Sequence, residues 1–368
     1  MISDDTRFMA LALQLGQRGL GQVWPNPAVG AVIVVQGRIV GRGWTQPGGR
    51  PHAETMALAQ AGDLARGATA YVSLEPCAHH GKTPPCAQAL ISAGITRVVS
   101  AIQDPDSRVG GRGHAMLRAA GVEVTTGVLA TQAAESHLGF FTRITQARPM
   151  VTLKLALSLD GRIATAAGES RWITGPQARA RVHLMRAQHD AVLVGAGTAR
   201  ADDPHLGVRG LGIAAQPVRV VASAGLDLPQ GGALAASAAE GRLWLLHGAG
   251  LVGECYDFWQ AQGARLLPVA LGPDGALAVG AMLGALAGQG IGRVFCEGGG
   301  ALAAGLLQAG FVDRLAIFHA GLMLGAGGRA GVGPLADQPL ALFDRFELAG
   351  TEVLGPDVLN LWRKSSAV

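Results

Sequence analysis

Lysine is rare in this 368-residue chain and occurs only as Lys82, Lys154 and Lys364. The formal net charge is +4 and no basic run is present, which argues against a nucleic-acid-binding surface. The longest apolar run, residues 28–35, is far too short to span a membrane. The first residues lack the basic segment and apolar core of a secretory signal. These absences predict a cytoplasmic protein with no nucleic-acid partner and no membrane partner.

Cysteine is also scarce, with four copies in the whole chain. Cys255 and Cys296 lie far from the other two, and we expect them to be buried as small hydrophobic residues. A disulfide between Cys77 and Cys86 is disfavoured, because thiols stay reduced in the cytoplasm. These two thiols are therefore available to a metal ion.

The residues His52, Cys77 and Cys86 are the ligand types that zinc prefers. Three protein ligands are typical of a catalytic zinc site, whose open position holds a water. Zinc lowers the pKa of that water to about 7. Glu54 stands two residues after His52, close to the metal but not bound to it, and can move a proton from the water to a leaving amine. His-x-Glu followed by Pro-Cys and a second Cys is the pattern of the zinc deaminases.

Other interpretations of this motif exist. A closed structural zinc site could take His79 or His80 as fourth ligand, which leaves Glu54 without a role. The chain could then be a zinc module fused to a nucleotide-sensing domain. A nucleic-acid deaminase with an appended domain is a further alternative. Eight residues separate Cys77 from Cys86, however, where the nucleic-acid enzymes have two.

Two domains are expected from the length of the chain. Strands alternate with helices in both halves, which predicts a layered α/β fold for each. A linker near residues 145–149 would separate a domain of residues 1–145 from one of residues 149–368. The predicted strands of the first half are 29–35, 38–43, 69–74, 96–102 and 122–125, with helices at 3–18, 52–61, 84–93 and 110–120. Those of the second half are 150–157, 190–194, 217–222, 242–246, 264–271 and 292–296, with clear helices at 176–189 and 301–309.

A glycine-rich turn, residues 297–300, joins the last predicted strand to the last predicted helix. Glycine lets a backbone approach a phosphate, and a helix N-terminus offers free amides. The pattern is not Gly-x-Gly-x-x-Gly, and it comes late in its domain. A phosphate site and a plain tight turn both fit these residues.

The long loop between the cysteines, preceded by Glu75-Pro76, resembles the bifunctional riboflavin-biosynthesis deaminase/reductase family (RibD type). The resemblance extends over the whole chain, through segments 154–161, 168–174, 184–187, 198–204 and the turn at Glu297. It implies an N-terminal cytidine-deaminase-like three-layer α/β/α domain and a C-terminal dihydrofolate-reductase-like α/β domain. It also implies zinc and NADPH as cofactors, and a homo-oligomer, either dimer or tetramer.

Two successive reactions are implied by the resemblance, both on small phosphoribosyl pyrimidines. The first deaminates 2,5-diamino-6-ribosylamino-4(3H)-pyrimidinone 5′-phosphate. The second uses NADPH to reduce the ribosyl group of 5-amino-6-(5-phosphoribosylamino)uracil to a ribityl chain.

The resemblance further implies contacts at individual residues. Arginine is suited to a substrate phosphate. Expected NADPH contacts are Ala156, Trp172, Thr198, Asp202, Ser223, Gly299, Gly300, Ala301, Leu302 and Ala303. Expected substrate contacts are Asn26, Lys82 and Asp104 in the first half, and Ser170, Arg186, Leu206, Arg209 and Glu297 in the second. Three residues depart from the family pattern without removing a zinc ligand or Glu54: Met56, Asp106 and Ala222.

Overall fold

The chain divides into two compact units, Met1–Ala147 and Arg148–Val368. The structure is a computed structural model that describes residues 3–79, 84–107 and 109–365. Helix α5 (Ala130–Gln146) continues into the predicted linker, so the connection is shorter than expected. Within the described residues, no helix is both long enough and apolar enough to cross a membrane.

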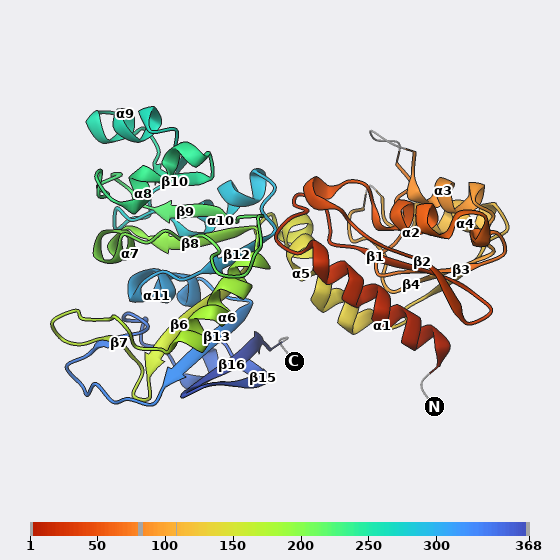
Figure 1. The fold of residues 1–368 in the computed structure, drawn as a ribbon. Coiled ribbons are helices and arrows are strands. Elements are labelled where there is room, and N and C mark those ends of the chain that lie inside the picture. The colour runs from red at the N-terminus through yellow and green to blue at the C-terminus, as the bar shows by residue number, and fades with distance from the viewer. Residues whose placement is uncertain (1–2, 80–83, 108, 366–368) are drawn as a thin grey trace. The chain divides into compact units, whose positions relative to one another are not determined.

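Unit 1 is a sheet with helices on both faces (Figure 1). Along β1 the side chains alternate: Val32 and Val34 pack with α1, whereas Ala31 and Ile33 pack with α2. This two-residue period is what a strand covered on both faces requires. The strand order is β2-β1-β3-β4-β5, with β1 Gly30–Val35, β2 Arg38–Trp44, β3 Thr69–Val72, β4 Arg97–Ser100 and β5 Glu123–Thr126. The other helices are α1 Asp4–Gly16, α2 Ala53–Ala61, α3 Cys86–Ser92 and α4 Arg112–Ala119.

Helix α2 lies unusually close to strand β2. A Cβ added to Gly43 would be 2.1 Å from the carbonyl oxygen of Ala53, and one added to Gly41 would be 2.2 Å from that of Ala57. Only glycine fits at these two strand positions, because any side chain would collide with the helix backbone. The contact fixes the start of α2, where His52 and Glu54 lie.

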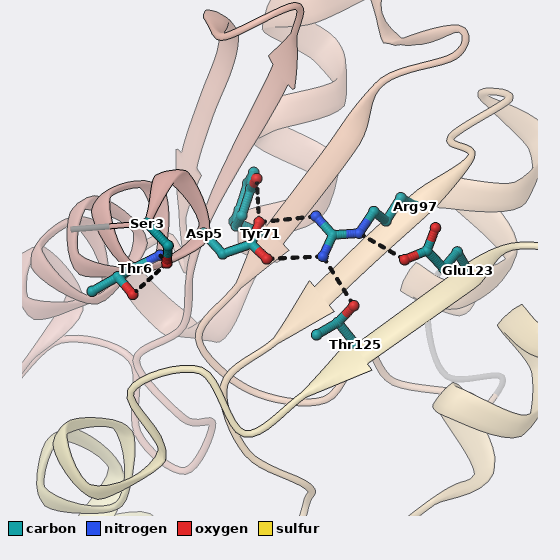
Figure 2. Close-up of polar contacts among 7 residues, drawn as sticks. All are labelled: Ser3, Asp5, Thr6, Tyr71, Arg97, Glu123 and Thr125. Carbon is teal, nitrogen blue, oxygen red and sulfur yellow. Dashed lines mark hydrogen bonds and ion pairs between the residues drawn. The ribbon is translucent and has the colours of Figure 1, made fainter. Parts of the chain in front are cut away.

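A polar network ties α1 to the sheet (Figure 2). Arg97 on β4 donates to both carboxylate oxygens of Asp5, at 2.9 and 2.8 Å. Tyr71 on β3 donates to the same carboxylate at 2.8 Å. Arg97 also donates to Glu123 and Thr125 on β5. One helix and three strands are therefore joined by the Arg97 guanidinium together with the Asp5 carboxylate.

Unit 2 contains a nine-stranded sheet in the order β11-β10-β9-β8-β12-β6-β13-β16-β15. Strands from β11 to β13 run parallel, and β16 and β15 are antiparallel additions at one edge. The core includes Trp259, Phe295 and Phe318. The strands are β6 Met150–Ser158, β8 Ala191–Gly195, β9 Val218–Ala222, β10 Leu243–Gly248, β11 Arg265–Val269, β12 Arg293–Cys296, β13 Arg314–Ala320, β15 Phe346–Leu354 and β16 Asp357–Lys364. The helices are α6 Pro176–Ala187, α7 Ala196–Asp202, α8 Ala233–Ala236, α9 Glu254–Ala261, α10 Val279–Gly288 and α11 Gly300–Gln308, and a small separate sheet pairs β7 (Arg162–Ala164) with β14 (Arg329–Ala330).

The predicted α/β class is confirmed for both halves, and most predicted elements appear within a few residues of their expected bounds. The sequence analysis assigned no element to α5, β13, β15 or β16. Most residues of β15 are exposed, so no run of apolar residues marks this strand. Its pairing with β16 defines it instead.

Candidate active sites

Three elements bring the predicted zinc ligands of unit 1 together. His52 is the N-cap residue of α2, and Cys86 is the first residue of α3. Cys77 lies in the segment that follows β3. Both helix N-termini thus lie at the cluster, where their free amides favour negatively charged sulfur.

The geometry of this cluster fits zinc. Nδ1 of His52 lies 3.3 Å from Sγ of Cys86 and 3.7 Å from Sγ of Cys77. Usual zinc–ligand bond lengths across a tetrahedral angle place nitrogen and sulfur about 3.6 Å apart. Three or more His, Cys, Asp or Glu side chains with metal-ligand spacing could hold a metal ion. Among the described residues, His52, Cys77 and Cys86 form the one such group. His79 is exposed and is not part of it, and His80 lies outside the described residues.

The two sulfurs differ in their surroundings. The backbone N–H of Cys86 donates to Sγ of Cys77 at 3.3 Å. The side-chain hydrogen bond from Cys86, together with His52, lowers the pKa of Cys77 to about 4. The same interaction with Cys77, followed by burial, raises the pKa of Cys86. Contact between the two sulfurs therefore favours the thiolate form at Cys77 over Cys86.

Glu54 is 4% exposed and lies beside these sulfurs. Burial, followed by the negative charge of Cys77, raises the pKa of Glu54 to about 7. A bound cation would oppose the second cause. A carboxylate that titrates near neutrality can accept a proton and return it within one reaction.

The other predicted contacts of unit 1 lie on two loops. The side chain of Asn26 packs against Gly49, where an added Cβ would be 1.8 Å from Nδ2. Asp104 follows β4, and its Oδ1 accepts the N–H of Asp106 at 2.9 Å. Burial raises the pKa of Asp104, and the charge of His79 opposes this, so the Asp104 loop lies near the loop between the cysteines. Lys82 lies outside the described residues.

In unit 2, Glu297 is the centre of a charged cluster. It follows β12, and its carboxylate accepts two hydrogen bonds from Arg186 on α6, at 2.5 and 3.1 Å. Nζ of Lys154 on β6 lies 3.9 Å from the same carboxylate. Arg186 also donates to the carbonyl oxygen of Gly207 at 2.9 Å. Burial lowers the pKa of Lys154, whereas the positive charges of Arg186 and Lys154 hold the pKa of Glu297 below its usual value.

The predicted glycine turn lies at the same edge of the sheet. Gly299 is the N-cap residue of α11, and an added Cβ would be 3.2 Å from Oγ1 of Thr198 on α7. Strands β8 and β12 are parallel neighbours, so the turns that follow both lie at their carboxyl ends. Ligands of open α/β sheets bind at such ends. Asp202, the last residue of α7, also lies near this edge, since its negative charge acts to raise the pKa of Lys154.

The remaining predicted residues of unit 2 differ widely in accessibility. Trp172 is 68% exposed, and the guanidinium of Arg179 lies 4.6 Å from its ring centroid. Arg209 is exposed, whereas Ala303 is 0% exposed within α11. Ala301 is also exposed. The other predicted contacts are half-buried or buried: Ser170, Ala156, Gly300, Leu302, Ser223 and Leu206. Contacts to bound molecules stay predictions for all of them.

Two charged residues at these sites were missed by the sequence analysis. Lys154 was noted as one of three lysines and as the start of a motif, but no role was assigned to it, although the rarity of lysine in this chain was a usable signal. Glu75 was noted only as a neighbour of Cys77. Its carboxylate accepts hydrogen bonds from a distant helix, which no local pattern reveals.

Comparison with known proteins agrees with this arrangement. Residues 2–102 match the cytidine and deoxycytidylate deaminase zinc-binding region, and residues 149–360 match the RibD C-terminal domain. The class is therefore a zinc-binding deaminase region joined to a reductase domain. Riboflavin biosynthesis protein RibD of Escherichia coli strain K12 is 42% identical over 96% of this chain and 98% of its own length.

Solved structures extend the similarity over nearly the whole chain. Acinetobacter baumannii RibD (form 1) matches with a TM-score of 0.88 and 36% identity, covering 99% of both chains. A diaminohydroxyphosphoribosylaminopyrimidine deaminase/5-amino-6-(5-phosphoribosylamino)uracil reductase from Thermotoga maritima matches with a TM-score of 0.85 and 34% identity, covering 98% of this chain and 99% of the other. The chain belongs to the RibD family, whose members combine a deaminase and a reductase of riboflavin biosynthesis. The matched zinc-binding region and the cluster of His52, Cys77 and Cys86 identify zinc as a cofactor. NADPH stays a prediction from the family resemblance.

Proposed function

We propose that unit 1 deaminates 2,5-diamino-6-ribosylamino-4(3H)-pyrimidinone 5′-phosphate, and that unit 2 reduces 5-amino-6-(5-phosphoribosylamino)uracil. The proposal of deaminase activity rests on one observation, the cluster of His52, Cys77 and Cys86 with buried Glu54 beside it. The Thermotoga maritima relative has both activities in its name. A cytoplasmic location, expected from the composition and patterning of the sequence, and a homo-oligomer, implied by the family resemblance, stay predictions.

In unit 1 the three ligand side chains would hold zinc, which when bound activates water at neutral pH. Glu54 accepts the proton that the attacking water loses, then delivers it to the departing ammonia. Asn26 and Asp104 would orient the pyrimidine and the phosphoribosyl group. Burial of Glu54 excludes competing solvent from the proton transfer.

When bound in unit 2, NADPH would supply a hydride to the ribosyl carbon. The ribose ring oxygen must gain a proton as the ring opens. Lys154 is the half-buried cation placed to donate that proton, and Glu297 holds its charge in position. Thr198 and Gly299 would line the NADPH site, where a side chain at position 299 would obstruct the cofactor.

A coupled assay on the diamino-pyrimidine tests the proposal. We expect the zinc-loaded protein to release ammonia first and to oxidise NADPH only after that release. Ammonia release should be insensitive to moderate salt, because the substrate is a free nucleotide and not a polyanion. Release from single-stranded DNA or RNA, without activity on the free nucleotide, would contradict it.

A further inference from the structure

Glu75 is a buried carboxylate two residues before Cys77, with a side chain that is 2% exposed. It accepts four backbone hydrogen bonds. Oε1 accepts the N–H groups of Gly113 and His114, at 2.8 and 3.3 Å. Oε2 accepts those of Gly111 and Asp104, at 2.8 and 3.2 Å.

Three of these donors belong to the first turn of α4. The N-cap residue of this helix is Gly111, which has no side chain to cap it. Helix N-termini leave free N–H groups and a positive dipole end, so a carboxylate supplied from elsewhere stabilises them. Contact is close, since a Cβ added to Gly113 would be 1.9 Å from the carbonyl oxygen of Pro76. The first turn of α4 is therefore held against the segment that leads into Cys77.

The fourth donor is the backbone of Asp104, one of the predicted substrate contacts. The side chain of Asp104 folds back to accept the N–H of Asp106. A Cβ added to Gly110 would be 2.5 Å from the carbonyl oxygen of Asp104, so this loop packs against the residues that begin α4. Through Glu75, the Asp104 loop and the Cys77 segment share one anchor.

We propose that Glu75 is a positioning residue of the deaminase site, which sets the place of Asp104 relative to the zinc ligand Cys77. The substrate is then held at a fixed distance from the reacting centre. This role rests on the proposed function of unit 1. It needs no contact between Glu75 and substrate, because the carboxylate is fully used by backbone donors.

The substitution Glu75→Gln keeps the size and shape of the side chain but changes its hydrogen-bonding groups. Glutamine fills the same volume, but one of its two terminal groups is an amide NH₂. This NH₂ group would take the place of a carboxylate oxygen and face two backbone N–H groups. It cannot accept a hydrogen bond from either of them. Either the pair from Gly113 and His114 or the pair that includes Asp104 then loses its partner.

The test is a double-variant cycle in the full-length zinc-loaded protein, with Glu75→Gln, Asp104→Ala and both together. We expect Glu75→Gln to keep one zinc per chain and normal NADPH-dependent reduction. Its kcat/KM for ammonia release should fall about 10-fold or more, since small misplacements of substrate are costly. The double variant should lie within about twofold of Asp104→Ala alone, because both changes remove the same interaction.

Glu123→Gln is the matched control, the same change at a side chain on β5 that is 68% exposed and pairs with Arg97, and should behave as wild type. Wild-type kcat/KM in Glu75→Gln, or losses that multiply in the double variant, would overturn the positioning role. A wild-type protein that releases no ammonia would instead refute the proposed function. If Glu75→Gln loses zinc or unfolds, the same cycle with Glu75→Asp, which keeps both oxygens but retracts them, decides by the same criterion.

Discussion

Glu54 combines burial, a pKa raised to about 7 and a place beside the zinc ligands. Glutamine in its place keeps the shape but can neither accept nor return a proton. We expect Glu54→Gln to retain zinc and to lose about 10²-fold or more of ammonia release, while reduction of the deaminated substrate is unchanged. Metal analysis and separate assays of both reactions check this. Near-normal ammonia release would assign the proton transfer to another group.

Cys86 offers a direct test of the metal site. It begins α3, and its sulfur lies 3.3 Å from Nδ1 of His52. Cys86→Ala removes one of three ligands, so zinc content measured after dialysis should fall strongly. Cys255→Ala, at a half-buried thiol far along the sequence in unit 2, is the matched control and should keep full zinc. Equal zinc in both variants would rule out the proposed ligand set.

Lys154 is the residue through which unit 2 can be tested. Methionine has a similar volume but no proton to donate, so Lys154→Met should abolish most NADPH oxidation and spare ammonia release. Lys364→Met is the control, because that lysine pairs with Asp344 and the carbonyl of Gly310 at the end of β16. A normal rate of reduction in Lys154→Met would show that another group protonates the product.

At the scale of elements, the Asp5–Arg97 pair joins α1 to β4 (Figure 2). The hydrogen bonds from Arg97, then those from Tyr71, lower the pKa of Asp5 below its ordinary value of 3.8. A lowered folded-state pKa means that the stabilisation is fully present above 3.8 and disappears as pH falls through the folded value. The ion pair between Asp5 and Arg97 therefore stabilises the folded state at neutral pH.

Asp5→Asn should accordingly lower the free energy of unfolding at pH 7 by about 1 kcal/mol. The difference from wild type should shrink towards pH 3. The difference is measured from the midpoint of urea unfolding, followed by pulse-labelled hydrogen exchange of the backbone amides of α1. Asp4→Asn, an exposed neighbour in the same helix turn, controls for the helix dipole. A difference that stays constant with pH, or that Asp4→Asn reproduces, would contradict the assignment.

At the scale of the whole molecule, each unit has its own sheet and core, so the two activities should be separable. Gly299→Val should impair reduction and spare ammonia release, because the added side chain enters the space beside Thr198. Gly284→Val, on α10 with open space around it, should leave both reactions intact. Equal loss of both activities in a folded, zinc-loaded Gly299→Val protein would refute the assignment of one reaction to each unit.

Several features of this protein could be predicted from local sequence. His52 and Glu54 open a helix, and Cys86 opens another after two prolines, because capping and proline geometry act over a few residues. The glycine turn before α11 was also found, since strand and helix periods are set by covalent geometry. The zinc ligands could be named because the ligand types and their spacing are a chemical requirement.

Other features were decided only by tertiary structure. Arg186 and Glu297 are 111 residues apart, and the order β8-β12-β6 brings them together with Lys154. The cap that Glu75 provides for α4 likewise joins segments 36 to 39 residues apart. Strands β13, β15 and β16 are defined by their partners. Local periodicity carries no information on which distant segments pair, because that choice depends on the packing of the whole unit around its core.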